Sequence, residues 1–257
     1  KASRIAAEGL VAVAVDGNKG AVVEVNSETD FVAKNDMFQE YVADAALVAL
    51  MHNGEVCDMK TFQCPKVHKS FEERLTDLIA KIGENMNLRR AAMLEVSNGV
   101  IASYVHNACK PNLGKIGVLV ALESNGDKAK LQELGKHIAM HVAASNPQFL
   151  TIADVDQASI DHEKAIFSEQ AKASGKPENI IEKMVEGRIK KYFDEVVLEE
   201  QAYIMDPDKK VKQIVADAAK EMGADIKLKA FVCFRLGEGL EKRNEDFAAE
   251  VASQLKK

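Results

Sequence analysis

Histidine side chains are the first candidates for metal or acid–base chemistry in this sequence of 257 residues. His137 and His141 lie one helical turn apart in the segment HIAMH. A zinc hydrolase with two histidines at this spacing needs a glutamate directly after the first one, and Ile138 stands there instead. We therefore predict that both are packing or surface histidines on a helix.

A second group of possible zinc ligands borders a single loop: His52, Cys57, Cys64 and His68. Their spacing is irregular and does not match the paired-ligand patterns of zinc sites. A plain surface loop is the favoured interpretation, with a metal-dependent hydrolase as a distant alternative. We predict no metal and no cofactor.

Phosphate-binding and hydrolytic motifs give no better candidate. The segments NLGKIG and ASGKPE lack the upstream glycine and the Ser or Thr that complete a phosphate-binding loop. No GxSxG or HExxH is present, and the many acidic residues are spread along predicted helix faces. The sequence therefore does not predict an enzyme.

The segment EVNSETDFVAKN, residues 24–35, is the most unusual polar stretch. Ser27 to Asp30 fits the capping-box pattern, so Asp30 has a structural role available at the start of a helix. Thr29 is an alternative N-cap, which would place Asp30 in the first turn, where a negative charge favours the helix dipole.

Phe31, next to Asp30, allows two interpretations. It could begin the buried stripe of the helix, because Phe38 follows seven residues later. However, its neighbours at i+3 and i+4 are Lys34 and Asn35, which interrupt the apolar stripe. The ring could therefore be exposed, as aromatic anchors of protein interfaces are. Spacing alone leaves both interpretations open.

The elements around this segment form a repeating pattern. GLVAVAVDGNKGAVVEVN predicts a β-hairpin that turns at Asp16, Gly17 and Asn18. A helix is predicted for residues 29–51, a loop for 52–66 and a second helix for 71–85. Strands are predicted at 91–96, 99–106 and 114–124, and a helix at 127–145. Hairpin followed by helix thus occurs twice, near 9–52 and 99–144, which predicts two related α+β subdomains.

The remainder of the chain is predicted to be mostly helical. Residues 156–195 are highly charged and divide at the segment SGKP, and Pro177 suits the first turn of the second helix. We therefore expect a protruding helical hairpin. A helix at 209–223, a strand at 226–239 and a closing helix at 244–255 follow.

Composition excludes several classes of protein. The net charge of −6 disfavours a strongly basic nucleic-acid binder. No apolar run is long enough to cross a bilayer. Four cysteines are too few for a disulfide scaffold and favour a reducing, cytosol-like compartment. The chain opens with KASRIAAEG, which we interpret as the start of a fragment that lacks an upstream part.

Several segments, in order and over nearly the whole chain, resemble the elongation factor Ts family, the exchange factors of elongation factor Tu. They are EVNSETDFVAKN, KIGENMNLRRAAMLE, SYVH, GVLVAL, KHIAMHVAASNP, SGKPENIIEKMVEGRIKKY and DFAAEVA. The resemblance implies an α+β core of two related hairpin-plus-helix subdomains, a protruding coiled-coil hairpin and a C-terminal helix module. The family's N-terminal ubiquitin-associated-like domain is expected to be missing.

On this chain, the resemblance implies the following division. Residues 1–98 form the N-terminal core subdomain, and 99–155 with 224–240 form the C-terminal one. The coiled-coil protrusion takes 156–223 and the C-terminal module 241–257.

The resemblance also implies a partner and a site. The partner is elongation factor Tu, GDP-bound or nucleotide-free, with no nucleic acid and no membrane. The implied contact residues are Thr29, Asp30, Phe31, Val32, Ile82, Gly83 and His106. Asp30 and Phe31 are expected near the magnesium site of Tu, whereas Ile82, Gly83 and His106 are expected to form a second contact of the C-terminal subdomain with domain 3 of Tu. A dimer through the coiled coil and a bacterial cytosol, or alternatively an organelle matrix, are further expectations. A scaffold without exchange activity is the alternative function.

Overall fold

The computed structural model describes residues 4–241 and has the predicted α+β composition. The first part of the chain contains these elements: β1 (Glu8–Asp16), β2 (Lys19–Ser27), η1 (Val32–Lys34), α1 (Asp36–Met51), α2 (Val56–Thr61), β3 (Gln63–Cys64), β4 (Lys69–Ser70), α3 (Phe71–Ile82) and β5 (Met86–Glu95). The second part contains these: β6 (Gly99–His106), β7 (Leu113–Gly114), β8 (Ile116–Ser124), α4 (Lys128–Ser145), η2 (Ile152–Asp154), α5 (Gln157–Lys172), α6 (Glu178–Val196), η3 (Leu198–Glu200), β9 (Ala202–Tyr203), β10 (Asp206–Lys210), α7 (Val211–Met222) and β11 (Ile226–Arg235).

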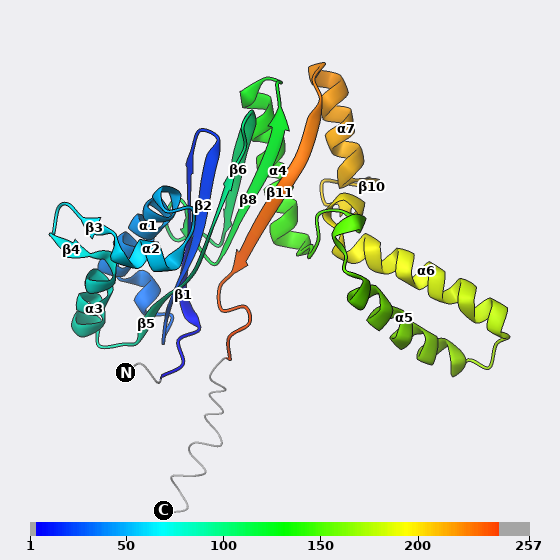
Figure 1. The fold of residues 1–257 in the computed structure, drawn as a ribbon, viewed down its shortest axis with the longest axis horizontal. Helices are drawn as coiled ribbons and strands as arrows, with labels where there is room; N and C mark the ends of the chain where they lie inside the picture. The colour runs from blue at the N-terminus through cyan, green and yellow to red at the C-terminus, as the bar shows by residue number, and fades with distance from the viewer. Residues whose placement is uncertain (1–3, 242–257) are drawn as a thin grey trace, which may run out of the picture.

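Two antiparallel sheets pack face to face in the centre of the molecule. Their strand orders are β5-β2-β1-β7 and β11-β8-β6. Figure 1 shows α1, α2 and α3 on one side of the sheets, and α4 and α7 on the other. In β1, Leu10 and Ala12 face the helices of the first side, whereas Val11 and Val13 face the second sheet. Since both faces of the strand are buried, its sequence is a continuous apolar run.

The two sheets repeat one arrangement. Strands β1, β2 and β5 have the same order in the first sheet as β6, β8 and β11 in the second. The twelve-residue helices α3 and α7 precede the third strand of each set, and each ends at a glycine with positive φ, Gly83 at 85° and Gly223 at 66°. Each third strand also has one extra residue in its pairing, Arg89 in β5 and Lys229 in β11.

The connection between the second strand and the helix distinguishes the two sets. Between β8 and α4 the connection has three residues, 125–127, whereas between β2 and α1 it has eight, 28–35. We call residues 28–35 the tip loop. The first long helix therefore begins at Asp36, and the predicted start near Thr29 is wrong.

Helices α5 and α6 form a hairpin that extends away from the two sheets (Figure 1). The turn between them contains Gly175, with φ of 69°. Pro177 is the N-cap of α6 rather than a residue of its first turn. At the base of the hairpin, the carbonyl of Val196 accepts hydrogen bonds from the amides of Gln148 and Phe149, at 2.8 and 3.1 Å.

Three details correct or limit the predictions. Helix α7 lies within the stretch predicted to protrude, but its Val211 and Val215 belong to the core formed with α4 and the second sheet. The second predicted helix ends at Ile82, and β5 begins at Met86, five residues earlier than predicted. The predicted closing helix, 244–255, lies outside the described residues. Within residues 4–241, no helix is both long and apolar enough to span a membrane.

Candidate functional site

The tip loop ends where Asn35 caps α1. The Asn35 side chain accepts hydrogen bonds from the amides of Met37 and Phe38, at 2.9 and 3.2 Å. Ser27 instead donates its hydroxyl to the carbonyl of Thr29, at 3.0 Å. The predicted caps at Ser27 and Thr29 are therefore wrong. Asparagine caps helices as well as serine does, and the eight-residue connection moves the start of the helix to Asn35.

Phe31 lies exposed on the tip loop, and the core interpretation of this residue is wrong. The residue is 74% exposed, whereas the following Val32 and Ala33 are buried. They belong to the core between the first sheet and helices α1, α2 and α3, which we call the first core. Asp30 is exposed as well. Val32 thus fixes the loop to the body while the carboxylate and the phenyl ring before it face solvent. Burial of a large exposed aromatic ring by a partner removes apolar surface from water and so stabilises the complex.

The tip loop is bonded to the turn between α3 and β5. The amide and the hydroxyl of Thr29 both donate to the carboxylate of Glu84, at 3.0 and 2.7 Å. In return, the amide of Asn85 donates to the carboxylate of Glu28, at 2.6 Å. Arg4 forms an ion pair with Glu28 at 3.5 Å. These contacts join segments that are 55 and 57 residues apart in the sequence.

The same contacts place Ile82 and Gly83 beside the tip loop. Ile82 packs against the first core, and Gly83 ends α3 in a left-handed conformation directly before Glu84. The two residues therefore lie in the first half of the fold, beside the tip loop, and not in the second subdomain. Of the implied contact residues here, Asp30 and Phe31 are exposed, whereas Thr29 and Val32 are occupied by contacts within the chain.

His106 lies at the end of β6, in the other sheet. It is exposed, and its Nδ1 is 3.0 Å from the hydroxyl of Tyr104. The loop that follows it reaches the start of α1, because Lys110 forms an ion pair with Asp36 at 3.0 Å. The structure therefore joins the neighbourhood of His106 to the end of the tip loop, while His106 itself is bonded within its own strand.

His141 is a packing histidine, in agreement with the prediction. It is completely buried, and its Nδ1 accepts a hydrogen bond from the amide of Ile204 at 3.2 Å. Its Nε2 lies 2.8 Å from Oε1 of Gln201, so this nitrogen carries the proton and donates it. Burial lowers the pKa of the His141 imidazole below its usual value, although the bond to Gln201 opposes the shift. The ring is therefore neutral and joins α4 to the segment after the helical hairpin.

The four possible zinc ligands are placed in different surroundings. Cys64 is buried and lies 3.6 Å from the guanidinium of Arg74, and the ring of His52 packs edge-on against Phe62. Cys57 and His68 are exposed. Among residues 4–241, no three histidine, cysteine or acidic side chains lie together in a way that could hold a metal ion.

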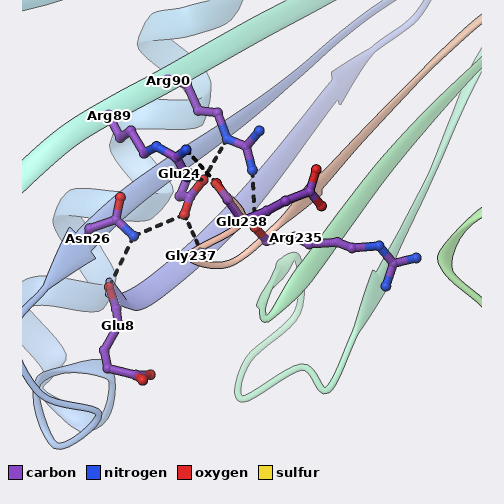
Figure 2. A network of polar contacts seen from close by, with 8 residues as sticks. All are labelled: Glu8, Glu24, Asn26, Arg89, Arg90, Arg235, Gly237 and Glu238. Carbon is purple, nitrogen blue, oxygen red and sulfur yellow. Dashed lines mark hydrogen bonds and ion pairs between the residues drawn. The ribbon is translucent and has the colours of Figure 1, made fainter. Parts of the chain in front are cut away.

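A buried polar network at Glu24 was missed in the sequence (Figure 2). Glu24 on β2 has no exposed surface, and its carboxylate accepts hydrogen bonds from Arg89, Arg90 and the amide of Gly237, at 3.0, 2.6 and 2.7 Å. Asn26 donates to the same carboxylate at 2.9 Å. The network fixes the segment after β11 to the first sheet. An acidic residue inside an apolar strand was the available signal, because a buried charge needs partners.

Comparison with known proteins agrees with the resemblance found in the sequence. The family model described as elongation factor TS matches residues 28–238. An elongation factor Ts of Paramagnetospirillum magneticum is 57% identical over 254 residues, which cover 99% of this chain and 81% of that protein. One from Rhodospirillum rubrum is 55% identical over 258 residues and covers 100% of this chain and 84% of the relative. The chain belongs to the elongation factor Ts family.

Proposed function

We propose that this chain acts in translation elongation as the guanine nucleotide exchange factor of elongation factor Tu. It binds Tu with GDP bound, promotes the release of GDP and remains on the nucleotide-free form until GTP binds. No covalent bond is made or broken, so the chain is not an enzyme in the chemical sense. Membership of the family and the exposed Phe31 on a loop fixed from both ends support this proposal.

The exposed phenyl ring is the observation that carries the mechanism. Asp30 and Phe31 approach Tu near its magnesium site, and the ring inserts between side chains of the nucleotide-binding domain. In a GTPase, Mg²⁺ bridges phosphate oxygens and groups of the protein. Because Mg²⁺ requires nearly ideal octahedral geometry, a small displacement of its surroundings weakens the binding of the metal and of GDP.

The coupling between the two ligands is reciprocal. If the chain lowers the affinity of Tu for GDP by some factor, GDP lowers the affinity of Tu for the chain by the same factor. The chain therefore dissociates when nucleotide rebinds.

We also propose how the rest of the chain takes part. Ile82 and Gly83 extend the contact surface of the tip loop, and His106 forms a second contact with domain 3 of Tu. The division into two core subdomains, a protruding hairpin and a C-terminal module is retained, with α7 assigned to the second core. The hairpin is a surface for self-association, and the chain works in the bacterial cytosol.

The experiment is release of a fluorescent GDP analogue from Tu, followed by stopped flow. We expect the chain to accelerate release and Phe31→Ala to lose most of this effect. Ile180→Ala is the matched control, because it shortens an exposed apolar side chain on α6, away from the tip loop. This variant is expected to accelerate GDP release as the unmodified chain does.

Two results would contradict the proposal. If the unmodified chain binds Tu without accelerating release, the chain is a scaffold rather than an exchange factor. If Phe31→Ala exchanges as well as the unmodified chain, the phenyl ring is not the group that disturbs the nucleotide site.

A further inference from the structure

We infer that Glu84 is a positioning residue for nucleotide exchange, whose carboxylate holds the tip loop in the conformation that presents Phe31 to the partner. This inference rests on the proposed function. Glu84 does not belong to the tip loop, and its role follows from the contacts that it makes across the fold.

Both carboxylate oxygens of Glu84 accept hydrogen bonds from one residue of the tip loop, Thr29. Oε2 accepts the amide of Thr29 at 3.0 Å, and Oε1 accepts its hydroxyl at 2.7 Å. Hydrogen bonds to a carboxylate are stronger than those between neutral groups. Because one bond is to the main chain, it fixes the path of the backbone two residues before Phe31.

The opposite contact makes the arrangement reciprocal. Glu28 of the tip loop accepts the amide of Asn85, the residue directly after Glu84, at 2.6 Å. Each of the two segments thus supplies one carboxylate that accepts a hydrogen bond, and one main-chain amide that donates to the carboxylate of the other segment. Two such bonds side by side oppose both sliding and rotation of the tip loop against the turn.

The second half of the fold shows that the turn itself does not need this carboxylate. Helix α7 ends like α3, at a glycine with positive φ, but the next residue is Ala224 where the first half has Glu84. The connection to α4 has three residues, so this half has no tip loop to hold. The carboxylate is present in the half that carries the eight-residue loop and absent from the half that lacks it.

The two ends of the tip loop are therefore fixed by different means. Val32 and Asn35 fix its end in the core and at the helix cap, whereas Glu84 fixes its beginning. Without Glu84, residues 28–31 would populate several conformations. The rate of exchange would then fall in proportion to the fraction of molecules that keep the competent conformation. Phe31 would remain exposed but would point to the partner for a smaller part of the time.

The test measures GDP release from Tu with Glu84→Gln, in the unmodified chain and in the Phe31→Ala background. We expect Glu84→Gln to reduce the maximal release rate about tenfold, because the amide keeps the shape and loses one acceptor and the charge. In the Phe31→Ala background we expect less than about a twofold further effect, because the ring to be positioned is gone. Glu95→Gln, at the far end of β5 in an exposed pair with Lys19, is the matched control and is expected to exchange normally.

A second measurement does not need Tu. Hydrogen exchange of the Thr29 amide in the free chain is expected to accelerate in Glu84→Gln and to stay unchanged in Glu95→Gln. Thermal unfolding of the same proteins shows whether the core remains folded.

The outcomes separate this inference from the proposed function. If Phe31→Ala slows release but Glu84→Gln does not, or if Glu84→Gln slows release equally in both backgrounds, the positioning role is overturned and the exchange function stands. Unchanged protection of the Thr29 amide overturns it as well. If the unmodified chain fails to accelerate release, the proposed function is refuted, and the role of Glu84 in exchange is refuted with it.

Discussion

Adjacent residues of the tip loop have opposite tasks. Thr29 and Val32 are bound within the molecule, by Glu84 and by the first core, whereas Asp30 and Phe31 face solvent. A short motif can therefore combine residues that support a surface with residues that form it. Substitutions in the motif are expected to divide into those that reduce stability and those that reduce exchange.

The effect of single substitutions on stability distinguishes the observed helix cap at Asn35 from the predicted capping box of Ser27 and Asp30. We expect Asn35→Ala to lower the free energy of unfolding by about 1 kcal/mol, because two amides of α1 lose their acceptor. Asp30→Ala is expected to change it by less than about 0.5 kcal/mol, since its side chain is exposed. Urea unfolding of the two variants checks this, and the opposite ranking would restore the capping box at Ser27.

The buried imidazole of His141 is expected to make the free energy of unfolding depend on pH. Its pKa is lowered in the folded chain, so the unfolded chain binds a proton more readily. The stability contributed by the neutral ring is therefore complete above the unfolded pKa of 6.5 and is lost as the pH falls below it. We expect His141→Gln to flatten the fall in stability between pH 7.5 and roughly 5.5, near the unfolded pKa.

At the scale of elements, the irregular pairing of β5 makes the Glu24 network possible. Consecutive residues of a regular strand point to opposite faces. The extra residue Arg89 disturbs this alternation beside Glu24, so that Arg89 and Arg90 both reach one carboxylate. Arg90 also lies over the ring of Phe234, 4.2 Å from its centroid. Arg90 thus connects β2 with β11.

We expect Glu24→Gln to lower the free energy of unfolding by about 3 kcal/mol, because it leaves two partly buried guanidinium groups without their shared carboxylate. Glu95→Gln, in an exposed pair at the end of the neighbouring strand β5, is expected to cost less than about 0.5 kcal/mol. Chemical unfolding of both proteins is the measurement. Equal losses would show that the network contributes no more than a surface ion pair.

At the scale of the whole molecule, the two halves share a strand order and differ in what is attached to it. The first half carries the tip loop, and the second carries the hairpin of α5 and α6. The common part supplies rigidity, because two sheets bury their facing side chains against each other. The attached parts are the places where we expect contacts with other molecules.

Replacing residues 160–190 with a short Gly/Ser linker is expected to leave the core folded, because the hairpin helices pack mainly on each other. The unfolding free energy of the core is expected to change by no more than about 1 kcal/mol. The shortened chain is also expected to accelerate GDP release from Tu as the unmodified chain does. Calorimetry and sedimentation would check stability and self-association together. Loss of the cooperative transition would show that the hairpin is part of the core.

The sequence by itself determined the local elements and the family. Apolar, β-branched runs on both sides of a turn predicted the first hairpin, and its strands β1 and β2 are buried on both faces. Periodicity predicted the helices, and ordered motifs predicted a relative of elongation factor Ts. The exposure of Phe31 stayed open, because spacing alone does not show whether another element covers a side chain.

Tertiary structure decided where distant residues meet. Glu84 is 55 residues from Thr29, and Gly237 is 213 residues from Glu24, so neither contact leaves a pattern in a local window. The cap at Asn35 was likewise decided by the length of a connection whose path depends on the core beneath it. Local propensities act over a few residues, whereas the free energy that selects these contacts comes from the packing of the two sheets, and this packing exists once the chain has folded.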